Sequence, residues 1–274
     1  MNTEQQVVRH YGRGGLEGTI LDALKRSGKD IDKLVTGDLS GDEFHLGWHA
    51  ATVELAKDLG LERGMHVLDI GAGIGGPARY FAEAHGCRVT GIDLTPEFVT
   101  VAESLTRRCG LNERVSFRQA SALALPFADK SFDRATLIHV GMNIADKPKL
   151  FAEARRVLGK GGRFGVYDVM RTAEGDLPFP LPWADTAATS FVESAETYRR
   201  LLAAAGFAIE TEQNRRELVV KLGREMRENA AKYGPPPLSS QVLMGPSMKE
   251  RLANVAAALE RAIIAPIEMI ARAV

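Results

Sequence analysis

A glycine-rich loop between a short apolar run and a helix-forming segment constrains the fold of this chain more than any other feature. The apolar run Val67-Leu68-Asp69-Ile70 leads into Gly71-Ala72-Gly73-Ile74-Gly75-Gly76, and residues 77–83 have a helical pattern. Glycine is needed where φ is positive or where the backbone approaches a ligand closely. A strand, a tight loop and a helix in this order predict an open α/β sheet with a ligand at the carboxyl ends of its strands.

Two carboxylates accompany this loop and narrow the choice of ligand. Asp69 lies two positions before the first glycine, and Asp93 ends the next apolar run, residues 88–93. The glycines fit G-x-G-x-x-G, so NAD is a candidate. Asp69 would repel a pyrophosphate but attract the ammonium and sulfonium of S-adenosylmethionine (SAM). Asp93 can accept hydrogen bonds from the ribose hydroxyls of either ligand. The alternative is that the two aspartates merely cap helices or turns; this explains each one alone but not their joint placement.

The motifs around these carboxylates resemble those of class I SAM-dependent methyltransferases. The resemblance is greatest to the small-molecule branch (methyltransferase type 11) that contains sarcosine and dimethylglycine N-methyltransferases. It extends from about Asp42 to Phe207 and includes Asp42-Glu43-Phe44-His45, Gly75-Gly76-Pro77-Ala78-Arg79, Leu125-Pro126-Phe127 and His139-Val140-Gly141-Met142-Asn143. It implies an enzyme that transfers a methyl group from SAM to a small molecule, with S-adenosylhomocysteine (SAH) as product. An amine acceptor is favoured; the alternatives are C- or O-methylation of a natural product or quinone-like acceptor, and SAM binding without catalysis.

The resemblance also implies a set of cofactor-binding residues. Ser121 stands where the family usually has an aspartate that holds the adenine amino group, and a serine hydroxyl can still accept one hydrogen bond. The set consists of Asp69, Gly71 and Gly73 for the methionine end, Asp93 for the ribose, Leu94 and Ala122 for the faces of adenine, Ser121 for its edge, and His139.

Two residues are candidates for catalysis. His139 follows a predicted strand at the edge where ligands bind, so it can take a proton from the acceptor or hold it. The alternative is a structural histidine that contacts SAM through its backbone. Tyr11 lies where relatives use a tyrosine to close over the methyl donor, and the alternative there is simple packing. Trp183 is interpreted as a pocket wall or as packing of the cap.

Composition limits the partners of the chain. It has 35 basic and 35 acidic residues and shows no basic stripe, which predicts a small-molecule substrate and no nucleic acid. The first residues are polar, and no apolar run has the length of a membrane span, so we expect a cytoplasmic protein without a membrane partner. Cys87 and Cys109 lack metal-site spacing, so no metal is expected. A homodimer is also considered.

The alternation of apolar and helical patterns predicts an α/β fold: a Rossmann-like, seven-stranded, mostly parallel sheet flanked by helices, with helical lid segments. We expect one domain over residues 1–274, with an N-terminal helical lid (1–59), a Rossmann-like core (60–214), and a C-terminal helical insertion and last strand (215–274). A C-terminal helix around residues 248–263 should end at Pro266. Expected strands are residues 66–70, 88–93, 115–120, 132–138, 162–168, 207–213 and 267–272, the last of which fits a short helix nearly as well.

Overall fold

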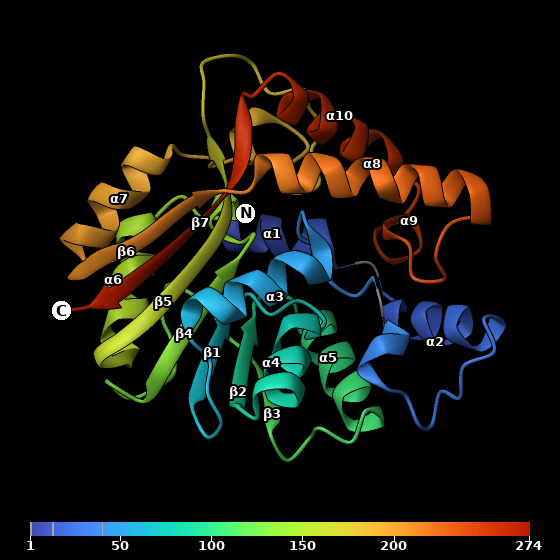
Figure 1. Ribbon diagram of the computed structural model, residues 1–274, viewed down its shortest axis with the longest axis horizontal. Coiled ribbons are helices and arrows are strands. Elements are labelled where there is room, and N and C mark those ends of the chain that lie inside the picture. The colour runs from blue at the N-terminus through green and yellow to red at the C-terminus, as the bar shows by residue number, and fades with distance from the viewer. Residues whose placement is uncertain (1, 13, 40) are drawn as a thin grey trace.

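The predicted sheet is present and has seven strands. The computed structural model describes residues 2–12, 14–39 and 41–274. The strands are β1 (His66–Ile70), β2 (Arg88–Asp93), β3 (Val115–Gln119), β4 (Phe132–Ile138), β5 (Leu158–Arg171), β6 (Phe207–Asn214) and β7 (Ile264–Ala273). Their order is β3-β2-β1-β4-β5-β7-β6, and only β7 runs antiparallel to its neighbours (Figure 1). The predicted fold class is therefore confirmed.

Helices cover both faces of the sheet because successive strand residues point to opposite sides. In β1, Val67 packs into the apolar cluster with α3 (Trp48–Leu59) and α4 (Gly76–His85), while Leu68 and Ile70 pack into the opposite cluster. The first layer continues with α5 (Pro96–Arg108), and the second contains α6 (Lys147–Val157) and α7 (Ala195–Ala204). Although α3 falls within the segment expected to form the N-terminal lid, it packs on the sheet.

Further helices form a cap beyond the sheet. They are α1 (Thr3–Tyr11), α2 (Leu16–Arg26), α8 (Arg216–Tyr233), α9 (Ser240–Met244) and α10 (Met248–Glu260). Figure 1 shows α8 and α10 side by side across one end of the molecule, and α9 and α2 are in contact. Short helical turns occur at Thr36–Leu39, Gly141–Asn143 and Ala187–Thr189.

The expectation for Pro266 was wrong. The helix ends earlier, at Glu260, and Pro266 lies inside β7 between two strands. Proline lacks an N–H group and is usually excluded from such a position. Here its carbonyl accepts a hydrogen bond from the Arg215 N–H at 2.9 Å, while the Arg215 carbonyl accepts from the Val219 N–H at 3.0 Å. An N–H group at position 266 would point toward the Arg215 carbonyl, where β6 ends and α8 begins. Because that carbonyl already accepts from Val219, the sheet loses no hydrogen bond.

The strand order reverses between β1 and β4. From β1 the sheet continues through β2 to β3 on one side and through β4 to β5 on the other. Connecting helices leave a crevice at such a point, at the carboxyl ends of the strands. Asp69 of β1 and Thr136 of β4 are paired in register there.

Candidate active site

A cavity of about 1060 Å³ lies between the carboxyl ends of the strands and the helical cap. Its volume reaches the upper end of the usual range for small-molecule sites, about 300–1,000 Å³. Of the predicted site residues, those that line it are Asp69, Gly71, Gly73, Asp93, Leu94, Ala122, His139 and Tyr11. The structure therefore brings together all of the predicted residues except Ser121.

Asp69 and the glycine loop that follows it line the cavity together. Gly71 has φ 75°, and a Cβ atom there would lie 2.3 Å from Cγ2 of Val140, so no other residue fits without a shift. Asp69 is 1% exposed, and its Oδ1 accepts a hydrogen bond from the Thr136 hydroxyl at 2.7 Å. Its Oδ2 is buried without a hydrogen-bond partner among the residues that the structure describes. Burial raises the pKa of Asp69 to about 6, against the lowering effect of the Thr136 hydroxyl. A cation would satisfy this carboxylate.

Asp93 holds the loop as well as facing the cavity. Its Oδ2 accepts from the Gly73 N–H at 2.9 Å, and its Oδ1 from the Thr95 N–H at 2.8 Å. Burial raises its pKa, although these backbone hydrogen bonds oppose the shift. Each oxygen keeps a second lone pair, so the geometry permits ribose hydroxyls as additional donors. The capping interpretation and the ligand interpretation of Asp93 are therefore compatible.

Ser121 is the predicted residue that is not among those lining the cavity. Its hydroxyl donates a hydrogen bond to Glu4 of α1, and its oxygen accepts one from the Leu123 N–H at 3.0 Å. Glu4 does line the cavity. The sequence offered no local signal for this pair, because its members are 117 positions apart.

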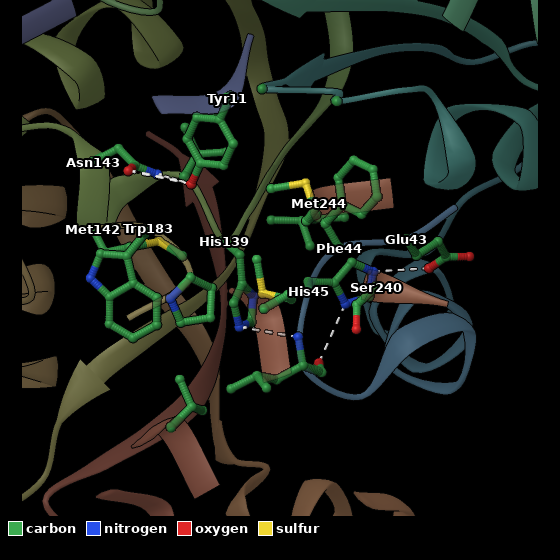
Figure 2. A pocket seen from close by; sticks show the side chains of 18 of the residues that line it. Tyr11, Glu43, Phe44, His45, His139, Met142, Asn143, Trp183, Ser240 and Met244 are labelled. Atoms are coloured by element: carbon green, nitrogen blue, oxygen red, sulfur yellow. Dashed lines mark hydrogen bonds and ion pairs between the residues drawn. The ribbon is translucent and has the colours of Figure 1, made fainter. Parts of the chain in front are cut away.

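His139 lies at the centre of the site. Its φ is 53°, and its Nε2 accepts from the Leu46 N–H at 3.4 Å. In this arrangement the proton is on Nδ1, which is buried and has no partner in the described part of the chain. Burial lowers the pKa of His139 well below its ordinary value, so the ring is neutral at pH 7. Figure 2 shows His139 beside His45, and their ring centroids are 5.8 Å apart.

Tyr11 closes another side of the cavity from α1. Its hydroxyl lies 3.3 Å from Nδ2 and 3.5 Å from Oδ1 of Asn143, the pair drawn together in Figure 2. Burial raises the pKa of Tyr11 to about 12, so the phenol stays protonated and can donate a hydrogen bond.

A buried polar cluster around Glu43 was not assigned a role from the sequence. Glu43 is 7% exposed, and its two oxygens lie 2.9 Å from Nε2 of His45 and 3.0 Å from Nδ1 of His49. Thr52 also donates to it. Burial raises the pKa of Glu43, but the histidine hydrogen bonds outweigh that effect and lower it to about 2. The available signal was the spacing of acidic and histidine residues in the Asp42–His45 motif and the following helix.

The part of the cavity away from the glycine loop has mainly apolar walls. Trp183, 4% exposed, contributes to these walls, and its indole N–H donates to Ser190 at 2.9 Å. Arg227, Lys249 and Glu260 border the cavity but are exposed. The larger aliphatic and methionine side chains that residues 216–260 contribute are Val219, Val220, Met226, Leu238, Met244, Met248, Leu252, Val255 and Leu259.

Comparison with known proteins agrees with this geometry. Residues 68–166 match a family described as "Methyltransferase domain". This part of the chain thus carries a methyltransferase domain. Over 118 residues (43% of the chain and 31% of the relative) it is 37% identical to a sterol 24-C-methyltransferase from Gibberella zeae. Over 165 residues (56% and 54%) it is 32% identical to the erythromycin 3''-O-methyltransferase of Saccharopolyspora erythraea. The chain thus spans about a third to a half of these relatives' lengths.

Solved structures share the whole fold. The [4+2]-cyclase SpnF has a TM-score of 0.70 and 23% identity, covering 100% of this chain and 97% of that one. Geranyl diphosphate C-methyltransferase from Streptomyces coelicolor, solved with SAH, has a TM-score of 0.71 and 15% identity, covering 100% and 98%. The sarcosine branch is represented by a structure from Galdieria sulphuraria with a TM-score of 0.65 and 20% identity, covering 94% and 97%. These likenesses establish the fold alone.

Two absences among the described residues concern membranes and metal ions. Within residues 2–12, 14–39 and 41–274, no helix has both the length and the apolar character needed to cross a membrane. The same residues contain no group of three or more His, Cys, Asp or Glu side chains arranged to hold a metal ion.

Proposed function

We propose that the protein transfers a methyl group from SAM to a carbon or oxygen atom of a bulky, apolar small molecule. The observation that supports SAM most strongly is Asp69, a buried carboxylate in the cavity with one oxygen unpartnered in the described chain. The positive charge of SAM would lie near it, whereas the pyrophosphate of NAD would be repelled.

The acceptor class follows from the walls of the cavity. Apolar side chains of α8 to α10 surround the space beyond the glycine loop, and such walls bind apolar molecules. The sterol and erythromycin relatives named above are a C- and an O-methyltransferase. These findings favour the C- or O-acceptor that the sequence left as an alternative over the amine that it favoured.

The positions of the site residues support a role for each of them. Asp69 and the Gly71–Gly73 loop would hold the methionine end, Asp93 the ribose, and Leu94 with Ala122 the adenine. When bound, SAM supplies an electrophilic methyl group on its sulfonium. His139 is neutral, as a proton acceptor must be, but its Nε2 must give up the Leu46 N–H to take a proton from an acceptor. Tyr11 can donate a hydrogen bond to a polar group of the acceptor.

Calorimetry with SAM, SAH and NAD tests the cofactor assignment. We expect binding of SAM and SAH and none of NAD. The acceptor assignment is tested with labelled SAM and a matched panel of apolar alcohols, phenols, carbon acids and amines. Label transfer to amines alone would contradict a C- or O-acceptor, and SAM binding without transfer to any compound would support the non-catalytic alternative. A cytoplasmic location and a homodimer stay predictions.

A further inference from the structure

Glu4 presents a carboxylate to the cavity from α1. It lies in the first turn of α1, is half-buried, and lines the cavity. Among the described residues, its side chain has one hydrogen-bond partner, the Ser121 hydroxyl, which donates to Oε1. No lysine or arginine of that part of the chain pairs with it. A carboxylate in this position can accept a further N–H or O–H group from a ligand.

Ser121 is less suited to the same purpose in this arrangement. Its one proton is donated to Glu4, and its oxygen accepts the Leu123 N–H at 3.0 Å, which leaves a single lone pair. The side chain is also absent from the described cavity lining, whereas its neighbour Ala122 belongs to it. Ser121 therefore orients Glu4, and Glu4 is the acceptor that faces the ligand.

In the sheet order, a nucleoside bound as proposed above would have its base near Glu4. The glycine loop follows β1, Asp93 ends β2, and Ser121 lies just beyond β3. These three strands are neighbours in the order β1, β2, β3. A ligand with its methionine end at the loop and its ribose at Asp93 extends its base toward the end of β3, where the carboxylate of Glu4 lies.

We propose that Glu4 recognises the adenine of SAM by accepting a hydrogen bond from its exocyclic amino group. This inference rests on the proposed function. The α1 helix would then be part of the cofactor site. Glu4 would hold the adenine amino group, as an aspartate at the position of Ser121 usually does in the class I methyltransferases that the sequence resembles. Ser121 is a positioning residue in this arrangement.

Calorimetry with two nucleosides tests the proposal. The probes are SAH and its 6-oxo (inosine) analogue, which carries an acceptor in place of the amino group. A hydrogen bond to a charged group changes affinity by about tenfold or more, so the native protein should prefer SAH by at least about that factor. In Glu4→Gln, SAH binding should weaken about tenfold, while the analogue should bind as well as before or better, because the glutamine amide can donate to the 6-oxo group.

A merely structural role for Glu4, as an anchor of α1, predicts a different result. Both nucleosides would then weaken by the same factor and the native preference would persist, which would overturn the proposal. The matched control is Glu217→Gln, the same change in the first turn of α8 and outside the cavity, which should alter neither affinity.

A double variant, Glu4→Ala with Ser121→Asp, removes the carboxylate on α1 and supplies one from the end of β3 instead. Recovery of the preference for SAH is the expected result; equal, weak binding of both nucleosides would contradict the placement of the base beside residue 121. If the native protein bound no SAH, the proposed function would fail. If it bound SAH but Glu4→Gln kept the native preference, only the present inference would fail.

Discussion

At the scale of single residues, the burial of Asp69 has a direct consequence for chemistry. Its carboxyl group is 1% exposed and has a pKa of about 6, well above the ordinary value near 3.9. Because the folded protein holds this proton more tightly than the unfolded chain, the contribution of Asp69 to the free energy of unfolding falls as the pH rises from about 4 to 6. A bound cation opposes this loss by stabilising the ionised form.

The affinity for SAM should therefore increase with pH over the range in which Asp69 ionises. Below its pKa, binding must displace a proton, and the dissociation constant should fall by up to about tenfold for each pH unit. Calorimetry at intervals between pH 5 and pH 7.5 measures this dependence. Asp69→Asn should bind more weakly at pH 7.5 and lose the pH dependence; an equally steep dependence in that variant would assign it to another group.

His139 can be tested with a substitution that suits its backbone. Its φ of 53° is tolerated by asparagine, so His139→Asn separates the imidazole from backbone strain. If the imidazole moves a proton of the acceptor, turnover should fall by about 10²- to 10⁴-fold with little change in SAM affinity. The measurements are kcat with an acceptor from the screen and the dissociation constant for SAM. A parallel loss of SAM affinity and melting temperature would instead support a structural histidine that supports Leu46.

At the scale of elements, the turn after β4 depends on one close approach. Gly141 opens the short helical turn Gly141–Asn143, and a Cβ atom there would lie 2.2 Å from Oδ2 of Asp168 and 2.3 Å from the Tyr198 hydroxyl. Those two atoms are themselves hydrogen-bonded, with Tyr198 donating at 2.7 Å. The turn thus packs against a buried polar pair, and this packing sets where Asn143 meets Tyr11.

Gly141→Ala should consequently destabilise the fold by about 1–3 kcal/mol, the usual cost of overpacking. Chemical denaturation measures the change, and activity should fall as well because His139 precedes the turn and Asn143 ends it. Gly18→Ala is the matched control: it lies within α2 with no atom within 4 Å of the added Cβ, and it should stabilise by up to about 1 kcal/mol. Unchanged stability of Gly141→Ala would mean that the polar pair moves apart at little cost.

At the scale of the whole molecule, the cavity lies between the sheet and the cap, so a ligand there joins the two. The α1 helix has no fully buried residue of its own; it is held by polar contacts around the cavity, including those of Glu4 and Tyr11, and by the packing of Tyr11 against Phe98. The α8 to α10 helices supply the walls on the other side. Ligand binding and the docking of the cap should therefore be coupled.

Thermal unfolding should report this coupling. At a SAH concentration of 100 times its dissociation constant, mass action stabilises the folded protein by about 2.7 kcal/mol. For a chain of this size that corresponds to a rise in melting temperature of roughly 5–10 °C. Differential scanning calorimetry with SAH and with NAD measures it, and only SAH should raise the melting temperature. An equal rise with NAD would contradict the role given to Asp69.

The sequence by itself determined the sheet, the glycine loop and the two aspartates beside it. These features depend on local information: alternating apolar residues define strands, positive φ selects glycine, and a residue that ends a parallel strand lies at the ligand edge. The motifs near the cofactor are local for the same reason, and they led to the SAM methyltransferase class. They contain little information about the acceptor. The amine was favoured only because the motifs resemble those of the sarcosine and dimethylglycine branch.

The tertiary structure decided what depends on residues far apart in the chain. It brought Glu4 to Ser121 across 117 positions and Tyr11 to Asn143 across 132, and it placed the apolar residues of α8 to α10 opposite the glycine loop. It also accommodated Pro266 inside β7, because the neighbouring strand ends where the missing N–H would have been needed. Such contacts follow from how helices pack over the sheet, and packing is a property of the whole chain that no local pattern encodes.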